Sequence, residues 1–216
     1  MAEAGIAHPS PKAVLWDLGG VILRTEDWKP REKWENALGL ERGELHRLVF
    51  EGEQGRLAAL GLSDAERVWN SIGQELAVSG ARLEQLRDDF WSGDRIDRRL
   101  TGIIRSLRPD YKTGLLSNAW PDVRTLLEDD WGLLDAFDLI VLSCEVGLVK
   151  PDPRIYQLAL KKLDLPPGEV VFIDDFRQNI EGARTAGMQA ILFEDIDQAL
   201  EELYRCLGRE ARPHTP

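Results

Sequence analysis

Cysteine and histidine are scarce in this sequence, and no long apolar run is present. Cys144 and Cys206 are the only cysteines among 216 residues. They are too few for a disulfide framework, which predicts a reducing, cytoplasmic location. No stretch reaches the ~18 consecutive apolar residues of a membrane helix. The N-terminus has neither the charged start nor the apolar run of a secretion signal, so we expect no membrane partner.

The three histidines do not form a recognisable site. His8 and His214 lie close to the two ends of the sequence, and His46 stands alone between them. We therefore expect neither a Ser-His-Asp triad nor a histidine metal site. A GxxxxGK[ST] phosphate loop and a GxGxxG dinucleotide turn are absent as well.

Positive charge is the minority in this chain. Its 27 Lys and Arg residues against 38 Asp and Glu residues give a formal net charge of −11. Nucleic acids and anionic membranes need a positive field over a broad face, so neither is an expected partner. With 43% hydrophobic and 30% charged residues, the composition is that of a globular protein. The length predicts one to two domains.

Five short apolar runs, each ending in small or polar residues, predict buried strands. They cover residues 13–18, 111–116, 139–143, 170–173 and 190–193. Segments with helical periodicity separate most of them, the clearest being Arg95–Leu107 and a last segment that Gly208 ends. This alternation predicts an α/β fold with a doubly wound, Rossmann-like parallel sheet.

The interval between the first and second strands breaks the alternation. It contains no convincing strand, and its apolar stripes predict three or four helices, one of them started by a capping box of Ser63 and Glu66. We expect a helical cap inserted after the first strand. The predicted boundaries are a disordered lead-in at 1–12, an α/β core at 13–24 and 95–208, the cap at 25–94, and a tail at 209–216.

Polar residues follow four of the predicted strands, where α/β sheets place their ligand sites. Asp17 precedes two glycines, the pair Ser117-Asn118 ends the second strand, Lys150 follows the third, and the pair Asp174-Asp175 ends the fourth. Each set taken alone is also compatible with an ordinary turn or helix cap. Two adjacent carboxylates repel each other unless a cation offsets them, and Mg²⁺ prefers oxygen ligands. Together the four sets indicate phosphoryl transfer to a carboxylate beside Mg²⁺.

Four segments in this order resemble the motifs of the haloacid dehalogenase-like hydrolase superfamily. They are Asp17–Val21, Ser117-Asn118, GLVKPDPRIY around Lys150, and FIDDFRQNIEGARTAGM. The likeness covers residues from about 13 to about 193. Within the superfamily the sequence is most similar to the small phosphatases that resemble the N-terminal domain of soluble epoxide hydrolase.

The resemblance implies roles for the reacting groups. Asp17 would be the nucleophile that becomes an aspartyl phosphate, and Lys150 would orient it and neutralise the transferring group. Ser117, Asn118 and Gly20 would bind the phosphoryl group.

The resemblance also implies a Mg²⁺ site. Asp17 and Asp175 would be direct ligands, and Asp174 would ligate directly or through another group. Gly19 would offer its backbone carbonyl. Most phosphatases of the superfamily carry a second Asp at the position of Gly19, where it protonates the leaving alcohol and activates water. Its absence implies slow turnover, with Glu26 or Asp27 as candidate substitutes.

The first hypothesis is therefore a Mg²⁺-dependent phosphatase for a small phosphorylated metabolite, such as a sugar phosphate. The second is a 2-haloacid dehalogenase, which the carboxylate pair disfavours because the departing halide is an anion. The third is a catalytically weak binding or regulatory module. Among the tryptophans, Trp34 and Trp69 are expected in the core, whereas Trp28 and Trp120 are expected in a substrate pocket. The chain is expected to be a monomer or homodimer.

Overall fold

The computed structural model describes residues 9–209 and contains a five-stranded parallel sheet. The strands are β1 (Ala13–Trp16), β4 (Lys112–Ser117), β5 (Leu139–Leu142), β6 (Val170–Asp174) and β7 (Gln189–Leu192). They match the five apolar runs, and their order in the sheet is β5-β4-β1-β6-β7. β1 is central and fully buried, because it pairs with β4 on one side and β6 on the other.

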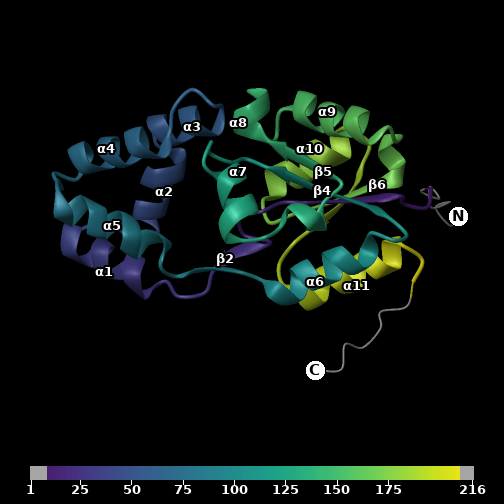
Figure 1. Ribbon diagram of the computed structural model, residues 1–216, viewed down its shortest axis with the longest axis horizontal. Coiled ribbons are helices and arrows are strands. Elements are labelled where there is room, and N and C mark those ends of the chain that lie inside the picture. Colours follow the sequence, from purple (N-terminus) through teal and green to yellow (C-terminus); the bar gives the residue numbers. More distant parts are fainter. Residues whose placement is uncertain (1–8, 210–216) are drawn as a thin grey trace, which may run out of the picture.

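Helices cover both faces of the sheet (Figure 1). Apolar residues of α6 (Arg98–Leu107) and α11 (Ile196–Cys206) pack on one face, and those of α9 (Pro153–Leu163) and α10 (Arg177–Thr185) on the other. The predicted doubly wound α/β fold is confirmed. Short helical elements complete the core: α7 (Val123–Thr125), η1 (Leu126–Asp130), η2 (Leu134–Ala136), α8 (Ser143–Val146) and η3 (Pro167–Glu169).

The predicted helix over 95–107 begins three residues late. The Asp97 carboxylate accepts the Leu100 N–H and caps α6, so the helix starts at Arg98. The preceding residues form a strand, β3 (Asp94–Ile96). The other end prediction is confirmed, because Gly208 has a φ of 65° and directly follows the last turn of the final helix.

The segment between β2 (Leu23–Thr25) and β3 contains five helices, rather than the three or four predicted. They are α1 (Lys29–Leu38), α2 (Glu44–Glu51), α3 (Glu53–Ala59), α4 (Ala65–Glu75) and α5 (Ala81–Trp91), which we call the helical insertion. They enclose a hydrophobic cluster of their own, which contains Trp34 and Trp69 as predicted. The capping-box prediction is wrong by one residue: Asp64, not Ser63, accepts the Arg67 N–H at the start of α4.

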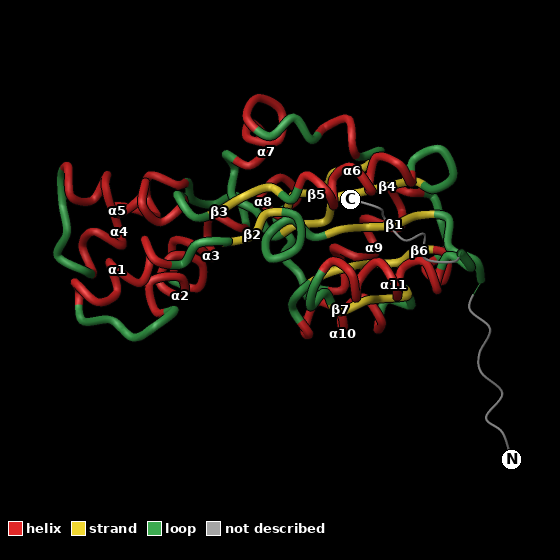
Figure 2. Tube along the Cα trace, turned by 90° about the horizontal axis from the view of Figure 1, so that it is seen from below, coloured by secondary structure: helices red, strands yellow, loops and turns green. Residues whose placement is uncertain are grey.

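A two-stranded antiparallel ribbon joins the helical insertion to the core. It pairs β2 with β3, and Thr25 Oγ1 donates to Asp94 Oδ1 over 2.7 Å. Figure 2 shows the ribbon between the α1–α5 helices and the sheet. The expectation of no strand in this interval is therefore wrong.

The helical insertion also touches the core at the end of β5. The Ser143 hydroxyl donates to the Ala59 carbonyl of α3 and accepts the Ala119 N–H of the core. Gly61 lies against the Cys144 carbonyl, and a Cβ at this glycine would be 2.2 Å from that oxygen. The insertion therefore has a second attachment besides the ribbon.

The two ends of the described chain belong to the core. Lys12 N–H donates to the Glu169 carbonyl, and Arg209 N–H donates to the Tyr204 carbonyl. Residue 12 is therefore ordered, although the predicted disordered lead-in included it. The remainder of those two predictions, at 1–8 and 210–216, lies outside the described residues. No helix within 9–209 is both long and apolar enough to cross a membrane.

Candidate active site

Asp17 leaves the end of the central strand with one carboxylate oxygen fixed. Its N–H donates to the Ile173 carbonyl of β6, which continues the ladder by one residue. Its Oδ1 accepts the Leu18 N–H at 2.7 Å and lies 2.8 Å from Lys150 Nζ. Within residues 9–209 no donor is bonded to Oδ2, so this oxygen is available to a ligand.

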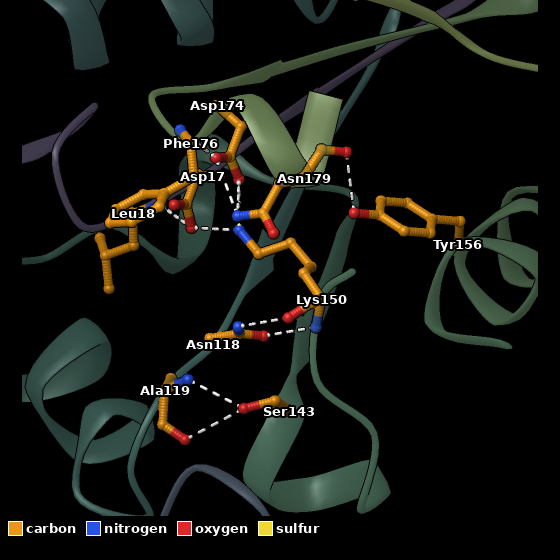
Figure 3. Close-up of polar contacts among 10 residues, drawn as sticks. All are labelled: Asp17, Leu18, Asn118, Ala119, Ser143, Lys150, Tyr156, Asp174, Phe176 and Asn179. Carbon is orange, nitrogen blue, oxygen red and sulfur yellow. Dashed lines mark hydrogen bonds and ion pairs between the residues drawn. The ribbon is translucent and has the colours of Figure 1, made fainter. Parts of the chain in front are cut away.

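Lys150 joins two of the acidic motifs. Its Nζ lies 2.8 Å from Asp17 Oδ1 and 2.6 Å from Asp174 Oδ2, and the side chain is only 1% exposed (Figure 3). Burial by itself lowers the pKa of Lys150, but the two carboxylates outweigh it and raise the pKa above its usual value. The ammonium is therefore charged and fixed between the strands β1 and β6.

The two members of the acidic pair differ in their surroundings. Asp174 is fully buried and accepts four contacts, from Lys150 Nζ, from Phe176 N–H and from Asn179 Nδ2 to both of its oxygens. Asp175 has a buried Oδ1 with no hydrogen-bond partner. A buried carboxylate oxygen without a donor indicates a missing ligand.

Gly20 makes room for this second carboxylate. A Cβ at residue 20 would lie 2.0 Å from Asp175 Oδ2, and the φ of Gly20 is +79°. Both observations require glycine here. The predicted role of Gly20 in substrate binding is untested by the structure, which shows it beside a metal-ligand candidate.

Burial and mutual repulsion perturb the free carboxylates. Burial, together with Asp174 and Asp175 and against Lys150, raises the pKa of Asp17 to about 7. Burial and the Asp174 charge raise the pKa of Asp175 to about 6. A divalent cation would lower the free-energy cost of ionising these carboxyl groups, because it favours their ionised forms.

The residues present fit a divalent metal ion. Asp17, Asp174 and Asp175 each offer a carboxylate oxygen within 4.8 Å of the others. When ionised they carry one negative charge each, and Lys150 offsets one of them, so a divalent cation balances the remainder. The Gly19 carbonyl is also available, since the neighbouring N–H groups of Ile22 and Leu23 donate to Leu18 instead. An all-oxygen set of this kind suits Mg²⁺.

The two residues of the second motif, Ser117 and Asn118, differ in their contacts. Ser117 is 2% exposed, and its hydroxyl has no hydrogen-bond partner in the part of the chain that the structure describes. Asn118, in contrast, uses both atoms of its amide on the Lys150 backbone: Oδ1 accepts the N–H and Nδ2 donates to the carbonyl. The structure therefore shows Asn118 positioning the lysine, whereas its predicted contact with a phosphoryl group stays a prediction.

Two supporting residues were not predicted. Asn179, on the first turn of α10, donates to both oxygens of Asp174, and its carbonyl accepts the Tyr156 hydroxyl at 2.9 Å. The spacing of five residues from Asp174 to Asn179 was a signal for the first. Tyr156 comes from α9 and gave no separate signal, since its helical spacing equally suits a core residue.

Two predicted groups have other contacts. Trp120 is 6% exposed and packs in the cluster of the helical insertion, 5.5 Å from the Phe50 ring centroid, so its prediction as a pocket residue is not supported. Asp27 accepts the Lys29 N–H at the start of α1. Trp28, at 42% exposure, is the tryptophan that remains available.

Comparison with known proteins identifies the family. Residues 11–187 match the haloacid dehalogenase-like hydrolase family. The chain is 30% identical to bifunctional epoxide hydrolase 2 of Sus scrofa over 91% of its own length, but it spans only 39% of that protein. It is 31% identical to a phosphatase of Mycobacterium tuberculosis, with 92% of this chain and 94% of that one covered.

Solved structures share the fold. A haloacid dehalogenase-like enzyme of Bacteroides thetaiotaomicron, in complex with magnesium and inorganic phosphate, superposes with a TM-score of 0.70 at 21% identity, covering 86% of this chain and 97% of that one. An L-2-haloacid dehalogenase of Xanthobacter autotrophicus gives 0.60 at 22% identity, covering 90% and 82%. The family match, which the sequence motifs predicted, establishes that this chain belongs to the haloacid dehalogenase-like hydrolases.

Proposed function

We propose that the chain is a Mg²⁺-dependent phosphatase that hydrolyses a small phosphorylated substrate through an aspartyl-phosphate intermediate. The observation that carries this proposal is the state of Asp17: Lys150 and the Leu18 N–H hold one oxygen, and the other is free. A nucleophile needs this combination of fixed orientation and an open electron pair. The phosphatase relatives and the magnesium–phosphate complex of the Bacteroides enzyme support it.

In the first step Asp17 Oδ2 attacks phosphorus while the bond from phosphorus to the leaving oxygen breaks. Lys150 holds Oδ1 and adds positive charge beside the group in transfer. The unpaired Ser117 hydroxyl donates to a phosphoryl oxygen. Asp17, Asp175 and the Gly19 carbonyl would hold Mg²⁺, which would neutralise negative charge on the group in transfer. Asp174 supports Lys150.

In the second step water attacks phosphorus, the bond from phosphorus to Asp17 Oδ2 breaks and restores the carboxylate, and the protons of the water leave with the inorganic phosphate or pass to solvent. The helical insertion is proposed to act as a cap that shields this chemistry from bulk water, with its boundaries at the β2–β3 ribbon. The oligomeric state, monomer or homodimer, stays a prediction.

A haloacid dehalogenase is the weaker alternative. Its reaction expels a halide anion, and the three carboxylates that cluster here would repel that anion unless a cation were bound. The unpartnered Oδ1 of Asp175 has a clear purpose only beside a cation. We therefore place phosphate ester hydrolysis first.

Asp17→Asn tests the proposal. We expect loss of Mg²⁺-dependent phosphate release from p-nitrophenyl phosphate, because an amide oxygen cannot displace the leaving group. When the wild type reacts briefly with substrate and is quenched with acid, the peptide that contains Asp17 should carry one added phosphoryl group. Mass spectrometry measures this mass increase. Turnover that survives in Asp17→Asn with an unchanged melting temperature, or turnover that EDTA leaves intact, contradicts the mechanism.

A further inference from the structure

We propose that this enzyme acts on substrates whose leaving group departs as an anion, without taking a proton from the protein. The substrate class is then an activated phosphoryl compound, such as an acyl phosphate, an aryl or enol ester, or an anomeric sugar phosphate, rather than the ester of an ordinary alcohol. This inference rests on the proposed phosphatase function and narrows its substrate.

The groups that surround the nucleophile have no proton to spare for a leaving oxygen. Asp17 is the nucleophile, and Lys150 is committed to two carboxylates at 2.8 and 2.6 Å. Asp174 accepts from three neighbouring residues, and Asp175 is assigned to the metal. Within residues 9–209, the acidic cluster has no further Asp, Glu, His or Cys member.

The helical insertion does not supply an acid in this structure. Asp27 is bonded to the N–H of Lys29, at the start of α1. His46 has Nδ1 3.3 Å from Arg31 and its ring packed 4.7 Å from Phe50, inside the insertion. Glu26, at the start of the insertion, is exposed, and its N–H is bonded to the Gly93 carbonyl.

Residue 19 is glycine although the backbone does not require it. A Cβ there would meet no atom within 4 Å, and the φ of Gly19 is not in the left-handed region. At Gly20, in contrast, a Cβ would lie 2.0 Å from Asp175 Oδ2, and the φ of +79° is in the left-handed region. Space for an acidic side chain therefore exists two residues beyond the nucleophile, and the chain leaves it empty.

The chemistry balances without an acid when the leaving oxygen is acidic enough. Asp17 Oδ2 forms its bond to phosphorus, and the electron pair of the broken bond stays on the leaving oxygen, which takes a proton from solvent later. A general acid typically contributes ~10²–10⁴-fold. An enzyme without a general acid loses this factor in full when the leaving group is an alcohol with a pKa near that of water, ~15.7. It loses much less when the leaving group is a phenol with a pKa of about 10.

The test is the dependence of kcat/KM on the leaving-group pKa. The wild type, Gly19→Asp and Gly19→Asn are assayed with saturating Mg²⁺ on acetyl phosphate, p-nitrophenyl phosphate, phenyl phosphate and glycerol phosphate. Gly19→Asn is the matched control, because it adds nearly the same atoms as Gly19→Asp without an acidic proton. Circular dichroism and melting temperature establish that each variant folds.

We expect the wild-type kcat/KM to fall steeply with leaving-group pKa, by more than ~10³-fold across the series. Gly19→Asp should raise the ratio of the glycerol phosphate value to the p-nitrophenyl phosphate value by ~10²-fold or more, whatever it does to the absolute rates. Gly19→Asn should keep the steep slope.

A flat wild-type profile, with glycerol phosphate cleaved as well as p-nitrophenyl phosphate, overturns the inference even if neither variant folds. Mg²⁺-independent or absent turnover of every compound instead overturns the proposed phosphatase function. A Gly19→Asn profile that flattens as much as that of Gly19→Asp shows that size, not acidity, matters at residue 19, and also contradicts the inference.

Discussion

At the scale of single residues, Gly20 and Asp175 depend on each other. We predict that Gly20→Ala weakens Mg²⁺ binding by about 10–100-fold, because the new methyl group would occupy the place of the Asp175 carboxylate. The positive φ of 79° adds a backbone cost of ~1–2 kcal/mol to folding. Isothermal titration with Mg²⁺ and urea unfolding measure the two effects.

Gly102→Ala is the control for this substitution. Gly102 lies inside α6, and a Cβ there meets nothing within 4 Å. Alanine is favoured over glycine in a helix interior by up to ~1 kcal/mol, so the control should be as stable as the wild type or more so, with unchanged Mg²⁺ affinity. Equal Mg²⁺ affinity in Gly20→Ala and Gly102→Ala would show that Asp175 is not a metal ligand.

The pKa values of the carboxylates predict that Mg²⁺ binding depends on pH. Both groups are raised, Asp17 to about 7 and Asp175 to about 6, so the metal-free protein holds protons there below these values. Mg²⁺ needs the ionised forms, and its affinity should therefore fall as the pH decreases from 8 to 5.5. Calorimetry in buffers of different ionisation enthalpy should detect proton release at pH 6.5, with less release in Asp17→Asn. A pH-independent affinity contradicts the prediction.

Several site residues could be predicted from the sequence because they lie at the ends of buried strands. Asp17 directly follows β1 and Asp174 is the last residue of β6, and the structure brings both to Lys150. The contact of Asn118 with the Lys150 backbone could not be predicted, since it depends on the path of a loop 32 residues away. The unequal surroundings of Asp174 and Asp175 also require the packed structure.

At the scale of elements, a buried arginine connects the helical insertion to the ribbon. Arg31 of α1 donates to both oxygens of Asp94 in β3 and to the Phe90 carbonyl of α5, and its side chain is 3% exposed. His46 of α2 lies 3.3 Å from its Nη1, and burial, together with the charge of Arg31, lowers the pKa of His46 to about 4. One guanidinium thus joins four elements.

We predict that Arg31→Met lowers the free energy of unfolding by about 3–5 kcal/mol, because it leaves the Asp94 carboxylate buried without its cation. Lys33→Met, on the same helix, removes a pair whose lysine side chain is 67% exposed, and should change stability by less than ~1 kcal/mol. Urea unfolding measures both. Equal effects of the two substitutions would show that the Arg31 contacts do not stabilise the insertion.

The ribbon itself was missed by sequence reasoning for a physical reason. Each strand has three residues, and both carry charged side chains, Arg24 in β2 and Asp94 and Arg95 in β3. Neither shows an apolar run or a clear alternation, and the two are about 70 residues apart in sequence. The five strands of the sheet were visible because continuous burial selects continuous apolar sequence.

At the scale of the whole molecule, the net charge is −11, whereas the substrate that we propose is an anion. We predict that kcat/KM for p-nitrophenyl phosphate at fixed free Mg²⁺ rises by a few-fold, ~2–5, between ~10 and ~150 mM KCl, because salt shortens the Debye length to ~8 Å and screens the repulsion. Initial rates measured over a series of KCl concentrations give this dependence of kcat/KM on salt. A decrease with salt would show that positive potential at the entrance outweighs the net charge.

The paired positions of the ribbon have a consequence for how this chain can vary. The polypeptide departs from the core at Thr25 and re-enters it at Asp94, and these two residues face each other across the ribbon. The length of what lies between them is therefore not constrained by the sheet: a short turn or a different helical module would close the same gap. This segment can therefore be exchanged for another module while Asp17, Lys150 and the acidic pair keep their places.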